Sequence, residues 1–158
     1  MLPQEVSQLI GKAGDVTILE VEKGAIKKFA DAVGDRNPLY WDEEHARSSR
    51  FGGIVAPPGF FGWPTKWTGA MPLFSELREE VINTINKAGY SRILDGGIEY
   101  DFYYPVRAGD TLSALLKVGE IHERETKTGN MVLSVTETTY TNQNGDIVAK
   151  ARQTLIAR

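Results

Sequence analysis

The chain has 158 residues and a formal net charge of −3, with 41% hydrophobic and 25% charged residues, which is typical of an ordinary globular protein with enough chain to bury a core. The small negative charge argues against non-specific binding to nucleic acid, and the absence of cysteine excludes disulfides, thiol catalysis and thiolate zinc sites. No apolar run approaches the ~20 residues that span a membrane, and the first residues lack the basic and apolar order of a signal peptide. We therefore expect a single domain over residues 1–158 with a cytoplasmic location, and neither nucleic acid nor a membrane as a partner.

Helices dominate the elements predicted for the first third of the chain. Apolar residues recur at helical spacing over residues 4–10 and 24–33, and Gly34 stands where a C-terminal cap belongs. Residues 17–21 are apolar and β-branched, which predicts a strand between these helices. Residues 42–48 begin with an aspartate N-cap and two acids in the first turn, which predicts a third helix.

A glycine- and proline-rich run over residues 52–59 precedes an aromatic segment. The order Pro57-Pro58-Gly59 favours the start of a helix, because proline is tolerated in a first turn. That helix would carry Phe60, Phe61 and Trp63. A further helix is predicted near residues 75–88. Its apolar face is made of Leu77, Val81, Ile82 and Ile85.

From residue 92 onward the sequence changes to β-type patterns. Strands are predicted over residues 98–104, 111–125, 131–141 and 147–156. The second of these is expected to bend near Gly119, and the Asn-Gly pair at 144–145 is a strong short signal for a hairpin. Several antiparallel strands after a helix-rich half predict an α+β fold.

The segment from Asp35 to Tyr40, together with Gly59, holds the candidate functional residues. An acid, an amide and a phenol follow the exit of a helix, and the backbone N–H of Gly59, at the start of an apolar helix, could hold an oxyanion. This order suggests a site that polarises a carbonyl group. Each residue also has a purely structural interpretation: a solvated helix end for Asp35, a turn for Asn37, core packing for Tyr40 and relief of crowding for Gly59.

Two segments carry a resemblance to a known family. Residues 29–40 read FADAVGDRNPLY and residues 100–112 read YDFYYPVRAGDTL. The first resembles the hydratase segment, and the second a later strand and turn, of the MaoC-like dehydratases, the (R)-specific enoyl-CoA hydratase family. The resemblance implies a hot-dog fold, in which a curved antiparallel sheet wraps around a central helix, with the helix near 75–88 as an insertion. It also implies a homodimer, or a heterodimer with a second hot-dog subunit, that binds an acyl-thioester substrate between the two folds.

The resemblance assigns roles to individual residues. In that family the segment reads Asp-x-Asn-Pro-Leu-His, and the Asp and His hold the water that adds to the third carbon of the acyl chain. By this match Asp35 is the acid, Asn37 the ordering amide and Gly59 the N–H donor that polarises the thioester oxygen. The family His is replaced by Tyr40, and a phenol with an ordinary pKa of about 10 is a poor base near neutral pH. A second family His, before the glycine, is replaced by Pro58, which has no titratable group and no backbone N–H.

Tyr40, Pro58 and the helix near 75–88 together look most like the branch called the MaoC dehydratase N-terminal domain. In that branch the domain is often the non-catalytic half, which supplies the groove for the acyl tail beside a partner that carries the Asp and the His. The aromatic segment after Gly59 would then line an acyl tunnel, and its alternative interpretation is ordinary core packing. Its residues are Phe60, Phe61, Trp63, Trp67, Met71 and Phe74.

We therefore expect a subunit of a hydro-lyase that hydrates enoyl thioesters, or dehydrates (3R)-hydroxyacyl thioesters, of CoA or acyl carrier protein. Two alternatives stay open: a self-sufficient hydratase in which Asp35 acts with Tyr40 or with His45, and a non-catalytic acyl-CoA-binding hot-dog protein. A thioesterase fits less well, because the Asp-x-Asn-Pro arrangement belongs to hydration. No metal and no cofactor are expected, and His122 is interpreted as a surface residue. The expected catalytic residues are Asp35, Asn37 and Tyr40. The expected substrate-binding residues are Pro58, Gly59, Phe60, Phe61 and Trp63.

Overall fold

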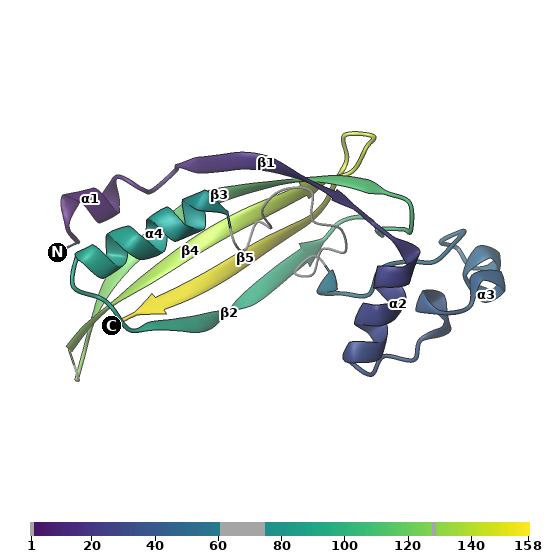
Figure 1. The fold of residues 1–158 in the computed structure, drawn as a ribbon, viewed down its shortest axis with the longest axis horizontal. Coiled ribbons are helices and arrows are strands. Elements are labelled where there is room, and N and C mark those ends of the chain that lie inside the picture. Colours follow the sequence, from purple (N-terminus) through teal and green to yellow (C-terminus); the bar gives the residue numbers. More distant parts are fainter. Residues whose placement is uncertain (1, 61–74, 128) are drawn as a thin grey trace.

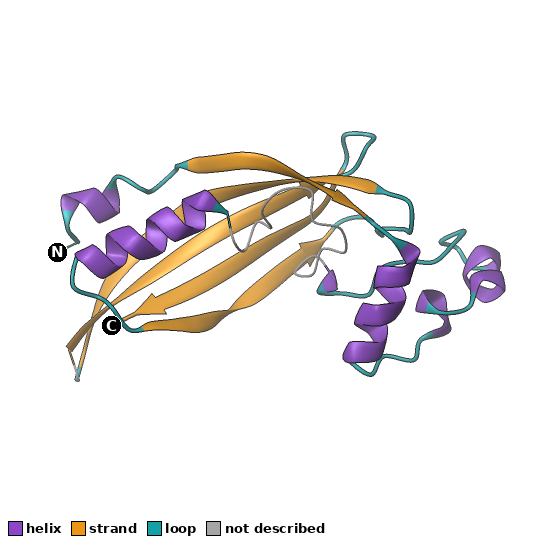
Figure 2. Cartoon of the chain, viewed as in Figure 1, coloured by secondary structure: helices purple, strands orange, loops and turns teal. Residues whose placement is uncertain are grey.

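The computed structural model describes residues 2–60, 75–127 and 129–158. The described helices are α1 (Gln4–Ser7), α2 (Lys23–Ala32), the 3-10 helix η1 (Pro38–Tyr40), α3 (Glu43–Ser48) and α4 (Glu76–Lys87). The described strands are β1 (Ala13–Glu20), β2 (Ile93–Phe102), β3 (Thr111–Thr126), β4 (Gly129–Thr141) and β5 (Ile147–Ala157). These strands form one curved antiparallel sheet in the order β1-β3-β4-β5-β2 (Figures 1 and 2). The predicted α+β class with a curved antiparallel sheet is confirmed.

The hairpins of the second half form where their turn residues predict them. The amide oxygen of Asn142 accepts hydrogen bonds from the N–H groups of Asn144 (2.9 Å) and Asp146 (3.0 Å), and Gly145 adopts the left-handed φ of 89° that glycine tolerates. The bend expected in the long strand is a β-bulge, seen as a register shift between Val118 and Glu120.

Strand β2 differs from its predicted bounds at both ends. It begins at Ile93, five residues before the predicted start at 98, because a bulge at Gly96 and Gly97 interrupts its alternating pattern without ending its pairing with β5. Gly97 has a φ of 106°, and a Cβ on Gly96 would come within 2.9 Å of the Thr154 side chain. The strand ends at Phe102, so the predicted last residues 103–104 lie beyond it.

Helix α4, expected near residues 75–88, is confirmed and is built into the core of the protein. It lies along one face of the sheet (Figure 1), and its buried residues recur every four positions, as one face of an α-helix requires. They are Leu77, Val81 and Ile85. This face belongs to an apolar cluster, here called the α4 cluster, whose sheet residues are Leu116, Val118, Ile121, Val132, Leu155 and Ala157.

A second apolar cluster, here called the α2 cluster, occupies the other end of the same face of the sheet. Helices α2, η1 and α3 gather there, away from α4 and from both chain termini (Figure 1). Ile26 and Ala30 of α2 are fully buried in it. Its sheet residues include Leu19, Leu112, Ala114, Tyr140, Ala149 and Ala151. The two clusters share one sheet face because the alternate residues of β3 and β5 contribute to both.

The aromatic segment predicted to open a helix is described only at its start. Phe60 is buried, 5% exposed, within the α2 cluster, whereas Phe61, Trp63, Trp67, Met71 and Phe74 lie outside the described residues. Among the helices that the structure describes, the longest, α4, has 12 residues, and none is both long and apolar enough to cross a bilayer.

Candidate functional site

A tight helix end places Asp35 at the exit of α2. Gly34 adopts a φ of 73°, which lets its N–H donate to the carbonyl of Asp31 (3.0 Å) and the N–H of Asp35 donate to the carbonyl of Ala30 (2.9 Å). This pair of hydrogen bonds is the Schellman arrangement that glycine favours after a helix. This arrangement fixes the direction of the chain after α2. Asp35 is half-buried at that point.

The next residues form a chain of local hydrogen bonds. A carboxylate oxygen of Asp35 accepts from the N–H of Asn37 (3.0 Å), and the amide oxygen of Asn37 accepts from the N–H of Leu39 (3.1 Å), which caps η1. The indole N–H of Trp41 donates to the carbonyl of Asp35 (3.0 Å). The Asn37 side chain therefore accepts the hydrogen bond expected of a turn residue. The side chains of Asp35 and Asn37 hold this segment in place through bonds to its own backbone.

Tyr40 is the buried member of this segment, at 8% exposure. Burial raises the pKa of its phenol above the ordinary value, and the charge of the nearby Asp35 carboxylate raises that pKa further. The two residues therefore interact electrostatically. Tyr40 is therefore a neutral phenol at neutral pH, which can donate a hydrogen bond, and a smaller fraction of it is in the phenolate form that could act as a base than in a free tyrosine.

Tyr40 opens onto a cavity of about 430 Å³, here called the Tyr40 hollow. Three separate segments build its wall: residues 39–40, residues 50–58 and residues 102–106. Backbone pairing holds the last two together, because Ala56 donates to the carbonyl of Val106 (2.8 Å) and Ala108 donates to that of Ile54 (3.0 Å). The lining residues are Leu39, Tyr40, Arg50, Phe51, Val55, Ala56, Pro57, Pro58, Phe102, Tyr103, Tyr104, Pro105 and Val106.

The residues expected to bind substrate do not share one position. Pro58 lines the hollow beside Tyr40. Gly59 follows it with a φ of 84°, a conformation that strains other residues, and none of the hydrogen bonds among the described residues uses its N–H as the donor. Phe60 packs edge-on against Phe29, with ring centroids 5.9 Å apart, and so belongs to the core. Phe61 and Trp63 lie outside the described residues.

Several lining residues were not expected from the sequence as site residues. Phe102, Tyr103 and Tyr104 stand at the end of β2, and Arg50 follows α3. The aromatic run lies within residues 100–112, the second segment of the family resemblance, so that segment gave a signal for it. Nothing in the local sequence indicated Arg50.

Neither histidine lines the Tyr40 hollow. His45 is exposed on α3, where its backbone N–H donates to the Asp42 carboxylate that caps the helix (3.0 Å). His122 is exposed on β3, and its ring lies 2.9 Å from Glu120. Within the described part of the chain, no three His, Cys, Asp or Glu side chains gather as a metal site would require.

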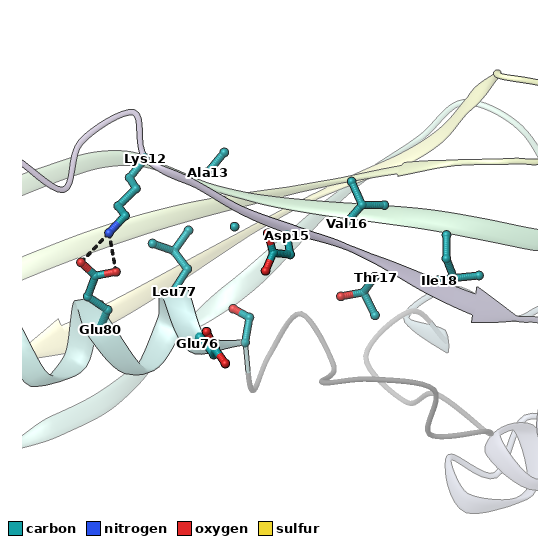
Figure 3. A pocket seen from close by; sticks show the side chains of 11 residues that line it. Lys12, Ala13, Asp15, Val16, Thr17, Ile18, Glu76, Leu77 and Glu80 are labelled. Carbon is teal, nitrogen blue, oxygen red and sulfur yellow. Dashed lines mark hydrogen bonds and ion pairs between the residues drawn. The ribbon is translucent and has the colours of Figure 1, made fainter.

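A second cavity, of about 640 Å³, lies between β1 and the start of α4 and is here called the β1 groove. Its lining residues are Lys12 to Ile18, Ser75, Glu76, Leu77 and Glu80. Figure 3 shows Lys12 and Glu80 closing one part of it, with the Lys12 Nζ 2.6 Å from both carboxylate oxygens. Asp15 and Glu76 add two further acids, so the groove is richer in carboxylates than in cations. It contains none of the residues from 35 to 60.

Comparison with known proteins places the chain in a family. A family model described as "FAS1-like, dehydratase domain region" matches residues 8–151. The chain is 31% identical over 140 residues to a UPF0336 protein of Saccharopolyspora erythraea, which covers 88% of this chain and 81% of that protein. It is 30% identical over 137 residues to the "Probable enoyl-CoA hydratase alpha subunit" of Thermomonospora curvata. This alignment covers 83% of this chain and 43% of that protein.

Solved structures agree on the fold. The ChsH1-ChsH2 complex from Mycobacterium tuberculosis matches with a TM-score of 0.81 at 22% identity, covering 97% of this chain and 93% of that one. A truncated HadBC (3R-hydroxyacyl-ACP dehydratase) complex from the same organism matches with a TM-score of 0.69 at 24% identity, covering 94% and 96%. A MaoC-like dehydratase from Rhodospirillum rubrum matches with a TM-score of 0.62 at 24% identity, covering 94% and 91%. Together with the match over residues 8–151, these findings confirm the resemblance: the chain belongs to the MaoC-like hydratase and dehydratase family and has its hot-dog fold.

Proposed function

We propose that this chain is a subunit of a hydro-lyase that hydrates enoyl thioesters, or dehydrates (3R)-hydroxyacyl thioesters, together with a second hot-dog subunit. One relative is named a probable enoyl-CoA hydratase alpha subunit. Another, 28% identical over 102 residues, is named a 3-oxo-4,17-pregnadiene-20-carboxyl-CoA hydratase alpha subunit. Both names belong to those proteins, and they support hydration of a thioester as the reaction class for this chain.

The observation that carries the proposal is the neutral phenol of Tyr40. Hydration adds the oxygen of water to the third carbon of the acyl chain and a proton to the second carbon, so one group must accept a proton and another must deliver one. Tyr40 stands where the family has its His, and its pKa is raised by burial and by Asp35. A group that stays protonated at neutral pH does not take the proton from water, so in this proposal Tyr40 does not replace the family base.

Asp35 and Gly59 keep the other parts of the family arrangement. Asp35 is half-buried next to Tyr40, where a carboxylate can order water or a hydroxyl group. The Gly59 N–H follows Pro58 of the Tyr40 hollow, donates to no acceptor among the described residues, and could donate to a thioester oxygen. In this proposal the hollow holds the thioester end of the substrate, and the second subunit supplies the base.

The second subunit has a surface to bind on this chain. β2 is an edge strand, paired with β5 on one side and with no described strand on the other. Large apolar side chains stay exposed along it and just beyond its end, which is unusual for an edge that faces only water. They are Leu94, Ile98, Phe102, Tyr103 and Tyr104. The solved neighbours described as the ChsH1-ChsH2 and HadBC complexes each pair two different chains, which supports the same arrangement here.

The test is hydration of crotonyl-CoA, followed by the loss of enoyl absorbance. The purified chain alone should not turn it over. The chain co-purified with a hot-dog subunit that carries the complete Asp-x-Asn-Pro-x-His segment should turn it over. If the chain alone hydrates crotonyl-CoA, the obligatory second subunit is wrong, and a self-sufficient hydratase using Asp35 replaces the proposal. If crotonyl-CoA binds in calorimetry but neither preparation turns it over, the chain is a non-catalytic acyl-CoA-binding protein.

A further inference from the structure

We infer that the β2 edge selects its partner by charge: it pairs with a hot-dog subunit whose own edge strand presents lysine or arginine, and it disfavours a second copy of this chain. This inference rests on the proposed function, because it concerns the second subunit, and it adds the chemistry by which that subunit is recognised. The acid of this chain that would contact the partner's cation is Glu99.

The edge strand itself is acidic. β2 contains Asp95, Glu99 and Asp101 but no lysine, arginine or histidine. In an antiparallel pair of strands, side chains that lie opposite each other interact, and like charges in that position are destabilising. Two copies of this chain joined along β2 would bring three acids from each strand to one interface, and neither strand would supply a cation. The charge of the strand therefore opposes pairing with itself.

Neighbouring cations neutralise only part of this charge. Arg152 of β5 lies 2.7 Å from Asp101 and 3.9 Å from Glu137, and Lys150 lies 3.2 Å from Glu137. Arg152 also lies 3.8 Å from Glu99. These three carboxylates thus share two cations, which leaves a surplus of one negative charge. Glu99 is the most exposed of the three, with 80% of its side chain accessible, so it is the acid best placed to accept a cation from a partner.

A β-bulge places acids on both faces of this edge. The register of β2 against β5 shifts at the bulge, so that Asp95 is aligned with Leu155 and Glu99 with Arg152. Leu155 and Arg152 are three residues apart on β5, so they point to opposite faces of the sheet, and so do the two acids aligned with them. A strand that pairs along β2 therefore meets negative charge on both of its faces. Bulges and charged side chains are also the devices by which natural edge strands avoid unwanted pairing.

The apolar residues of the same strand indicate that the edge is covered by a partner and is not merely protected from pairing. Leu94 and Ile98 are 38% and 42% exposed. Large apolar side chains gathered on one surface mark a site that another protein covers. Apolar contact would stabilise any complex at this edge, whereas the acids discriminate between partners, because charge complementarity sets specificity more than affinity.

The test is the variant Glu99→Lys, which gives the edge strand the cation that it lacks. Sedimentation velocity measures self-association of the purified chain, and calorimetry measures its binding to the catalytic hot-dog subunit of the crotonyl-CoA test. Exchanging a like-charge contact for an opposite-charge contact across paired strands changes affinity about tenfold. Glu99→Lys should therefore tighten self-association about tenfold and weaken binding to the second subunit about tenfold. Loss of structure in the variant would weaken both.

Glu120→Lys is the matched control, because it makes the same change in net charge at an exposed acid of β3, which β4 and β5 separate from the edge. It should change neither affinity. Sodium chloride gives a second measurement, because it screens exposed charges. Added salt should tighten self-association of the unaltered chain and weaken that of Glu99→Lys.

The inference is overturned if Glu99→Lys leaves both affinities unchanged or moves them in the same direction. It is also overturned if Glu120→Lys has the same effects, since total charge and not the β2 edge would then be responsible. In either case, hydration of crotonyl-CoA by the two-subunit preparation still decides the proposed function. If the unaltered chain does not bind the second subunit at all, the inference and the proposed function fail together.

Discussion

The two ends of the covered sheet face differ in what they bury. The α4 cluster is aliphatic, with Ile85, Val118 and Val132 fully buried, and none of the buried residues described in it is titratable. The α2 cluster contains two buried tyrosines, Tyr40 and Tyr140, and it adjoins the Tyr40 hollow. Three buried polar residues of β4 separate the clusters on this face: Ser134, Thr136 and Thr138. The difference indicates that α4 holds the fold together, whereas our proposal assigns the chemistry to the end near α2.

The largest expected effect comes from restoring the family base at the functional end. Tyr40→His places a group with an ordinary pKa of about 6.5 beside Asp35, and general-base catalysis contributes about 10²–10⁴-fold in rate. We expect the purified variant to hydrate crotonyl-CoA without a second subunit, with a rate that rises through the histidine pKa. Tyr40→Phe is the control and should remain inactive alone. A folded Tyr40→His protein with no more turnover than Tyr40→Phe would contradict the assignment of the missing base.

At the structural end, Ile85→Ala should unfold the protein more readily without touching the site. Ile85 is fully buried against the sheet, and removing such a side chain costs about 2–5 kcal/mol in the free energy of unfolding. Urea denaturation measures it. Ile147→Ala, at a position 42% exposed, should cost much less. If Ile85→Ala weakened crotonyl-CoA binding by the folded protein, the division of labour between the two ends would be wrong.

Alkaline pH should act mainly through the α2 cluster. Burial raises the pKa values of Tyr40, Tyr100 and Tyr140, and a charged neighbour adds to the effect for the first. Since the unfolded chain releases these protons first, their contribution to stability is fully present below pH ~10 and is lost as pH rises above it. The urea midpoint should therefore be flat at neutral pH and fall above ~10. Tyr140→Phe should make that fall shallower, and an unchanged slope would sink this explanation.

The smallest expected effect is at the N-cap of α4. The Ser75 hydroxyl oxygen accepts from the N–H of Arg78 (3.3 Å), and loss of such a cap costs about 1 kcal/mol. Ser75→Ala should lower the free energy of unfolding by that amount in urea titrations. Ser48→Ala provides the comparison, because the Ser48 hydroxyl only donates to a carbonyl within the short helix α3 (2.9 Å). A smaller loss at Ser75 than at Ser48 would mean that α4 does not depend on its cap.

Features that depend on local chemistry could be read from the sequence. The period of apolar residues predicted α4, the Asn-Gly pair predicted the last hairpin, and Gly34 predicted the end of α2. The segment from Asp35 to Tyr40 was also recognisable, since its turn is made by its own side chains.

Features that depend on distant parts of the chain could not be predicted in this way. The hollow exists because residues 54–56 pair with residues 106–108. The local pattern of residue types does not predict such a long-range contact. The hydrogen bond from the Arg107 Nε to the Phe51 carbonyl follows from the same pairing. The early start of β2 was missed because the bulge at Gly96 and Gly97 interrupts the alternation of apolar and polar residues that marks a strand.

The central claim, that a thioester binds at the hollow beside Tyr40, is tested most directly by hydrogen–deuterium exchange with and without crotonyl-CoA. The account predicts that the ligand slows exchange of backbone amides in residues 50–58 and 102–106, which line that hollow. Residues 12–18 and 75–80, which line the β1 groove, should exchange at unchanged rates. Protection confined to the β1 groove, or no protection in either region at saturating ligand, would contradict the account.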